Sequence, residues 1–156
     1  MRLKVQFTAA LLAGLSCFGA AQAQETKTVI EAGNVLAEPG EGYLKNRTIT
    51  VKDGRIVRIE RGFTTHPEKV EVINLREAFI IPGLIDSHVH LTNEFSPNSR
   101  VKALGESEVD AALNGVENAK KTLLAGFTTV QDVGSPNEAI FSLRDAIRAG
   151  KVTGPR

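Results

Sequence analysis

The first part of the chain alternates short β-branched runs with turns. These runs occupy residues 28–30, 48–51, 56–59 and 70–75, and polar residues, glycine or proline separate them. Asp53-Gly54 lies between two of the runs, and this dipeptide tolerates the positive φ angles of a tight hairpin turn. The pattern therefore predicts a β-sheet between Thr28 and Ile81, with a hairpin at Asp53-Gly54.

After Pro82 the pattern changes to strand, loop, helix, strand and helix. Apolar runs predict strands over residues 84–90 and 127–133. Between them, Ser107 and Asp110 have the spacing of a helix-capping pair, and Gly126 supplies a C-terminal stop. The apolar positions of this predicted amphipathic helix follow helical spacing: Val109, Ala112, Leu113, Val116 and Leu123.

A second helix is predicted after residue 133. Ser135 has the position of an N-cap, Pro136 of the first helical residue and Glu138 of the third, and Gly150 ends the apolar periodicity. Because a strand, a helix and a strand follow one another, we expect parallel pairing of the two strands with a right-handed crossover. The change of pattern near Ala78 divides the chain into residues 24–78 and 79–156.

Composition narrows the class of protein. The 156 residues are 42% hydrophobic and 24% charged, which is typical of a soluble globular chain with one domain or two small ones. A formal net charge of +1 offers no broad basic surface, so no nucleic-acid partner is expected. A single cysteine excludes a disulfide scaffold and a thiolate zinc site within one chain. A metal would have to use histidines and carboxylates.

Residues 1–23 have the pattern of a secretory signal peptide. A basic start precedes an apolar run over residues 5–20, and Ala21-Gln22-Ala23 is a small-residue cleavage site. The run is shorter than the roughly 20 apolar residues of a membrane span. A lipid anchor on Cys17 is disfavoured because Gly14 stands where a lipoprotein signal has leucine. We expect a periplasmic or secreted protein, not held in the membrane after cleavage.

Two histidines share one predicted strand. Side chains alternate along a strand, so Asp86, His88 and His90 lie on one face, while Ile85 and the residues in step with it lie on the face under the helices. The two imidazoles are close enough to share one cation, and Asp86 could accept a ring N–H or stabilise the charged centre. The alternative is a pair of hydrogen-bonded histidines at a strand end. Their convergence with a carboxylate at the C-terminal end of a strand favours a metal.

These residues also carry a family resemblance. The stretch Pro82-Gly83-Leu84-Ile85-Asp86-Ser87-His88-Val89-His90-Leu91 resembles the first barrel strand of the metal-dependent amidohydrolase superfamily. Gly126-Phe127-Thr128-Thr129-Val130-Gln131-Asp132-Val133-Gly134 is similar to the second barrel strand of its imidazolonepropionase-like and Xaa-Pro dipeptidase-like branch. Residues 51–59 resemble the small β-sandwich that precedes the barrel in many members.

The resemblance implies an α/β fold in two parts. Residues 24–78 would be part of a small N-terminal β-sandwich, and residues 79–156 the first two βα units of a TIM-type (β/α)8 barrel that is truncated here. Such a barrel takes about 250 residues, and Gly154-Pro155-Arg156 stands where the third strand should start. We therefore expect an N-terminal portion that is inactive alone.

The resemblance also implies a chemistry. His88 and His90 would bind one or two divalent metal ions, Zn²⁺ or another, and a metal-activated water would hydrolyse a carbon–nitrogen bond in an amide, cyclic amide or dipeptide. The substrate would be a small or dipeptide-like molecule. The remaining ligands and the catalytic aspartate of the superfamily come from later strands, so no catalytic residue is assigned here. A homo-oligomeric full-length form is compatible with this expectation.

Three questions stay open at the level of sequence. Asp132 could shape the site or brace the sheet. The loop over residues 91–106 is long enough to form a lid or pocket wall. The alternative function is a non-catalytic secreted domain that serves as a binding or structural module.

Overall fold

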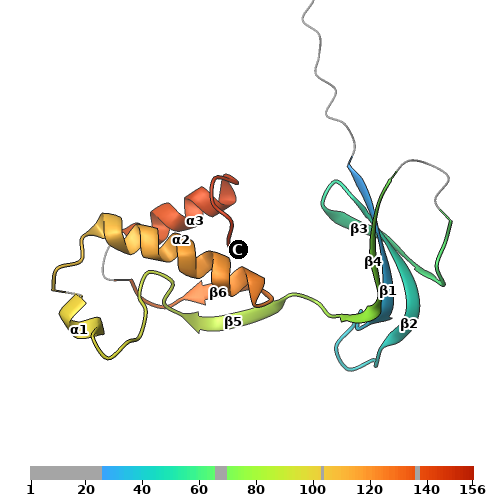
Figure 1. The fold of residues 1–156 in the computed structure, drawn as a ribbon, viewed down its shortest axis with the longest axis horizontal. Helices are drawn as coiled ribbons and strands as arrows, with labels where there is room; N and C mark the ends of the chain where they lie inside the picture. The colour runs from blue at the N-terminus through green and yellow to red at the C-terminus, as the bar shows by residue number, and fades with distance from the viewer. Residues whose placement is uncertain (1–25, 66–69, 103, 136–137) are drawn as a thin grey trace, which may run out of the picture.

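The computed structural model describes residues 26–65, 70–102, 104–135 and 138–156, which form a mixed α/β structure (Figure 1). The predicted signal peptide, residues 1–23, lies outside the described residues. None of the helices in these ranges is long and apolar enough to cross a membrane. The elements in chain order are β1 (Lys27–Val35), β2 (Leu44–Lys52), β3 (Arg55–Arg61), β4 (Glu71–Ile80), β5 (Leu84–Val89), α1 (Ser99–Lys102), α2 (Glu108–Leu124), β6 (Phe127–Asp132) and α3 (Ala139–Arg148).

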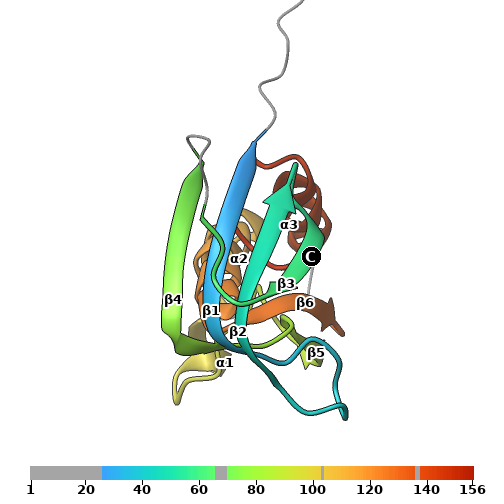
Figure 2. The ribbon, with the colours of Figure 1, turned by 90° about the vertical axis from the view of Figure 1, so that its right-hand side faces the viewer.

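The first four strands form one sheet in the order β3-β2-β1-β4. Neighbouring strands are antiparallel except β1 and β4, which are parallel and lie side by side in Figure 2. Asp53 and Gly54 have φ angles of 49° and 73°, which confirms the predicted hairpin turn between β2 and β3. A second layer of the expected β-sandwich is not among the described residues. The sheet contains a small buried cluster of Ala32, Val35 and Ile49.

β1 and β4 both extend beyond their predicted ends. The register between them shifts between Ala32 and Asn34, where β4 has an irregularity that local apolar patterning does not reveal. At this irregularity the Arg76 guanidinium donates to Glu31 Oε2, with N–O distances of 2.8 and 2.9 Å. This ion pair joins the middle of β1 to the middle of β4.

The second region, residues 84–156, consists of two parallel strands under two helices. β5 pairs with β6 in the predicted parallel orientation, and Figure 1 shows α2 and α3 on the same face of the pair. At the start of α2, Ser107 Oγ accepts the Asp110 N–H and the Asp110 carboxylate accepts the Ser107 N–H. Gly126 follows the helix with a φ of 99°. The predicted capping box and helix stop are both confirmed.

The packing of α2 differs from its sequence pattern. The buried residues of the helix are small: Ala111, Gly115 and Ala119. A Cβ added at Gly115 would lie 2.9 Å from Leu143 Cδ2, so glycine permits the close approach of α3. The large apolar positions point elsewhere, and Val109 and Leu113 are 68% and 64% exposed. Helical spacing identified the helix correctly, but it did not identify the face that packs against α3.

The predicted N-terminus of the second helix is wrong in one respect. α3 starts at Ala139, and its N-cap Glu138 makes no side-chain capping hydrogen bond. The hydroxyl of Ser135 instead lies 3.0 Å from that of Thr92, in the loop that follows β5. This long-range partner draws Ser135 away from a capping role. Pro136, the expected first helical residue, lies outside the described residues.

Arg156 is paired with the edge of β6 that lies away from β5. The Arg156 N–H donates to Thr128 O at 2.9 Å, and the Val130 N–H donates to Arg156 O at 2.8 Å. One residue that bonds in both directions to positions two apart on its neighbour has the pattern of a parallel strand pair. β6 therefore has partners on both sides at this point.

Candidate functional site

The two histidines of the sequence motif lie at the C-terminal end of β5. His88 is in the strand and exposed, and His90 follows its last residue. Their ring centroids are 5.5 Å apart with an interplanar angle of 75°. The structure therefore brings the two imidazoles together, as expected for alternate positions on one strand.

The orientation of the His90 ring is set by a backbone carbonyl. His90 Nδ1 lies 2.7 Å from Gly134 O, in the loop that follows β6. A carbonyl oxygen can only accept, so Nδ1 carries the proton and a neutral ring has its free lone pair on Nε2. A Cβ at Gly134 would lie 3.4 Å from His90 Cε1, so glycine lets the ring pass close to this backbone.

The sequence suggested that the Asp86 carboxylate could accept a histidine ring N–H, and the structure gives it a different partner. Its Oδ1 accepts the backbone N–H of His88 at 3.0 Å rather than a ring N–H. On the opposite face Val89 packs under the helices, as expected, but Ile85 is 73% exposed. The helical cover thus reaches the C-terminal part of β5 and leaves its start open.

Asp132 joins the ends of the two strands. Its Oδ2 accepts the backbone N–H of Leu91 at 2.8 Å, and its Oδ1 accepts that of Gly134 at 3.0 Å. These bonds brace the two strand ends, which is one of the two roles left open by the sequence. Sequence reasoning missed Gly134, whose carbonyl holds His90. The signal that could have found it is an Asp-x-Gly step directly after a strand, because aspartate accepts N–H groups two residues on.

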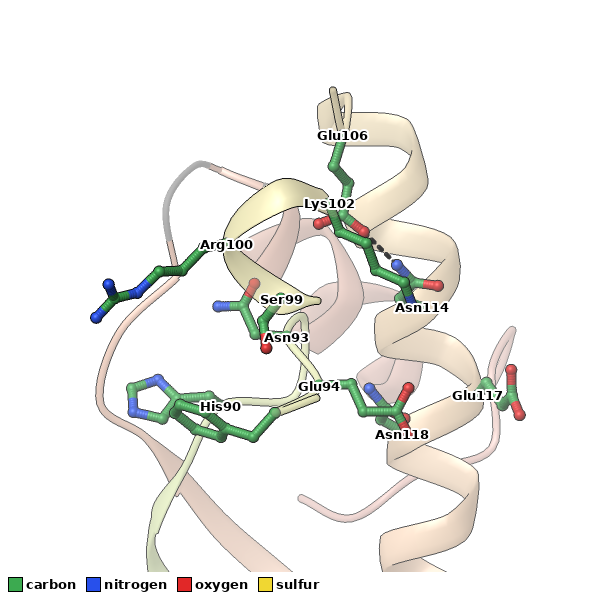
Figure 3. A pocket seen from close by; sticks show the side chains of 11 residues that line it. His90, Asn93, Glu94, Ser99, Arg100, Lys102, Glu106, Asn114, Glu117 and Asn118 are labelled. Atoms are coloured by element: carbon green, nitrogen blue, oxygen red, sulfur yellow. Dashed lines mark hydrogen bonds between the residues drawn. The ribbon is translucent and has the colours of Figure 1, made fainter. Parts of the chain in front are cut away.

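A cavity of about 400 Å³ adjoins His90 (Figure 3). The loop after β5, with its short helix α1, forms one wall, and α2 forms the other. The loop over residues 91–106 is thus a pocket wall, as the sequence suggested. The lining side chains are mostly polar: His90, Asn93, Glu94, Phe95, Ser99, Arg100, Lys102, Glu106, Asn114, Glu117 and Asn118.

The cavity contains charges of both signs. Arg100 and Lys102 extend from α1, while Glu117 is paired on α2 with Lys121, Nζ to Oε1 2.8 Å. The hydrogen bond from Lys121, followed by its charge, lowers the pKa of Glu117, and the same contact raises the pKa of Lys121. Both therefore stay ionised at neutral pH, but an exposed pair of this kind adds little stability.

The donor set partly matches a transition-metal site. Imidazole nitrogen is a common ligand of zinc, and a ring whose second nitrogen donates to a backbone carbonyl is oriented as metal-binding histidines usually are. Within the ranges that the structure describes, no group of three or more His, Cys, Asp or Glu side chains could hold one ion. The described residues therefore bring together two imidazoles as candidate ligands, and a complete site would need others.

Comparison with known proteins defines the class. The profile of the amidohydrolase family matches residues 79–156, which is half of the chain. The chain belongs to the amidohydrolase family. The matched region contains β5, β6, both histidines and the whole cavity wall.

Individual relatives support this assignment. A solved Xaa-Pro dipeptidase with bound methionine superposes with a TM-score of 0.74 and 33% identity, over 84% of this chain and 32% of that one. A dihydroorotase of Halalkalibacterium halodurans is 32% identical over 104 residues, 67% of this chain and 20% of the relative. A 5'-deoxyadenosine deaminase of Methanosarcina barkeri is 38% identical over 53 residues, 34% of this chain and 12% of the relative. The chain thus spans a third or less of the length of these relatives.

Proposed function

We propose that the natural protein containing this chain is a metal-dependent hydrolase of carbon–nitrogen bonds in amides, cyclic amides or dipeptides. The observation that carries the proposal is the pair of imidazoles at the end of β5, with rings 5.5 Å apart, in a chain of the amidohydrolase family. A dipeptidase, a dihydroorotase and a deaminase among the similar proteins support this bond class.

His88 and His90 would hold one or two divalent ions, with Zn²⁺ the first choice for imidazole ligands. When bound, such an ion supplies Lewis acidity, which lowers the pKa of water and polarises a carbonyl. The described residues of this chain would contribute the orientation of the His90 ring. The carbonyl of Gly134 keeps the proton of His90 on Nδ1 and so leaves Nε2 as the donor atom.

The cavity beside His90 is where we place part of the substrate. Its volume of about 400 Å³ lies in the range of small-molecule sites. The likeness to a dipeptidase supports a dipeptide-like substrate. Arg100 and Lys102 are the cationic lining groups of α1, and either could bind a substrate carboxylate.

We further propose that residues 79–156 are the first two βα units of a (β/α)8 barrel and that the chain alone is inactive. The parallel bonding of Arg156 to β6 supports a third strand that continues from this point. The exposed Val109 and Leu113 of α2 support a further packing partner for this helix. The remaining metal ligands would come from later strands.

The test uses the natural protein, recovered from the periplasm or culture medium as the predicted signal peptide requires. We expect a mature N-terminus at Gln24, hydrolysis within a panel of Xaa-Pro dipeptides, N-acyl amino acids and cyclic amides, loss of activity on chelation and recovery with Zn²⁺. Residues 24–156 alone, assayed in parallel, should show none. Chelation-insensitive hydrolysis would contradict the metal mechanism, and a folded, inactive, metal-free protein would favour the non-catalytic module.

A further inference from the structure

In the described residues three hydrogen bonds cross between the ends of β5 and β6, and the His90 ring makes one of them. The strands are still joined by backbone at Val133 N–H to Val89 O, 3.1 Å. Beyond that point the backbones separate, and the side chains of Asp132 and His90 take over the connection. We call His90, Leu91, Asp132 and Gly134 the strand-end network.

Asp132 determines the geometry of this network at two places. By accepting the Leu91 N–H at 2.8 Å it fixes the residue next to His90. By accepting the Gly134 N–H at 3.0 Å it turns the chain after β6 and places the peptide group whose carbonyl bonds to His90 Nδ1. One carboxylate thus holds both the backbone that carries the ring and the acceptor that orients it.

We propose that Asp132 is a positioning residue that fixes the tautomer and direction of the His90 ring through Gly134. This inference deepens the proposed function and rests on it for its catalytic meaning. Without the carboxylate, the Gly134 carbonyl is free to move away from Nδ1. The ring can then rotate or shift its proton to Nε2, which removes the lone pair that a metal would use.

The geometry separates this role from simple bracing. The contact between the hydroxyls of Thr92 and Ser135, 3.0 Å apart, joins the same two loops without involving Gly134. Loss of a brace should lower stability and leave the ring unchanged. Loss of a positioning residue should change the ring in a protein that is still folded.

The experiment measures the ring directly. The natural protein is labelled with ¹⁵N-histidine, stripped of metal and examined near pH 8 by two-bond ¹H–¹⁵N correlation, with the His90 signals identified by their loss in His90→Gln. We expect an Nδ1–H tautomer in the wild type and a shift toward Nε2–H in Asp132→Asn, larger in Asp132→Ala. Zn²⁺ titration of the same samples should show about 10–100-fold weaker binding in the variants.

Two control variants complete the design. Asp110→Asn removes a carboxylate that also accepts a backbone N–H, but at the start of α2, and Thr92→Val removes the parallel brace. Both should lower the melting temperature without altering the His90 signals. Asp132→Asn retains one acceptor oxygen and is the variant to read if Asp132→Ala does not fold.

The possible outcomes distinguish the positioning role of Asp132 from the proposed metal function. A folded Asp132→Asn protein with an unchanged His90 tautomer and unchanged Zn²⁺ affinity would overturn the positioning role. A wild type that binds no Zn²⁺ would overturn the proposed metal function, and the response of the ring to Asp132 would still be measured in the metal-free samples.

Discussion

The parallel pairs β1–β4 and β5–β6 are each joined by a carboxylate, but the two carboxylates have different partners. Glu31 in the first sheet is buried and accepts from the guanidinium of Arg76 on the neighbouring strand. Asp132 in the second region is half-buried, lies where the strands end and accepts two backbone N–H groups. Within the first sheet, the Glu31 carboxylate joins one strand to a side chain of the next strand. At the strand end, the Asp132 carboxylate instead fixes the backbone of the loop after β6. The Gly134 carbonyl of that loop then holds the His90 ring.

Gly33 in β1 and Gly83 directly before β5 each face the neighbouring parallel strand, and alanine at these positions should produce the largest effects on stability. A Cβ on Gly33 would lie 2.0 Å from the carbonyl oxygen of Arg76, and a Cβ on Gly83 2.1 Å from Thr128 Oγ1. Overpacking of this kind costs about 1–3 kcal/mol. We expect Gly33→Ala and Gly83→Ala to lower the free energy of unfolding of the natural protein, as measured by denaturant titration.

The two glycine variants should differ in how they can be rescued. Thr128→Gly removes the side-chain atoms that Gly83→Ala would meet, so the double variant should be more stable than the sum of the single effects. Truncation of Arg76 should not rescue Gly33→Ala, because the obstacle is a backbone carbonyl. Additive effects for the Gly83 and Thr128 pair would contradict the close contact between the start of β5 and β6.

The smallest expected effect is the loss of stabilisation by the α2 capping box at acid pH. The side-chain hydrogen bond from Ser107, followed by its backbone N–H, lowers the pKa of Asp110 from 3.8. Because the folded value is below the unfolded one, this stabilisation is complete above about pH 4 and is lost as the pH falls through the folded pKa. Ser107→Ala should cost roughly 1 kcal/mol at neutral pH.

The measurement for this prediction is amide hydrogen exchange at the first turn of α2. Exchange protection in the wild type, corrected for the intrinsic pH dependence, should decrease below pH 4. In Ser107→Ala the protection should already be low and change less. Equal acid responses in the two proteins would show that Asp110 does not act through the cap.

Local patterns predicted much of the fold because their causes are local. The Asp53-Gly54 turn, the Ser107 cap and the Gly126 stop each depend on neighbouring residues, and the structure confirms all three. The extension of β4 to Ile80 was missed because its irregular part is held by Glu31, which lies 45 positions away in the sequence. A partner so distant leaves no periodic signal.

The site shows the same limit. Alternation along a strand placed His88 and His90 together, since it depends only on strand geometry. It did not reveal the hydrogen bond from His90 to Gly134, nor the contact that draws Ser135 away from α3, because both form only when the two strand ends meet. Local spacing also did not predict that several apolar residues of α2 face outward, because their surroundings depend on distant parts of the chain.

The metal content of the natural protein tests the central claim most directly. Protein purified without added metal should contain at least one equivalent of a divalent ion per chain by elemental analysis. His88→Ala/His90→Ala should lose most of it while its circular dichroism spectrum stays that of the wild type. A metal-free wild type, or an unchanged metal content in the folded double variant, would contradict the account.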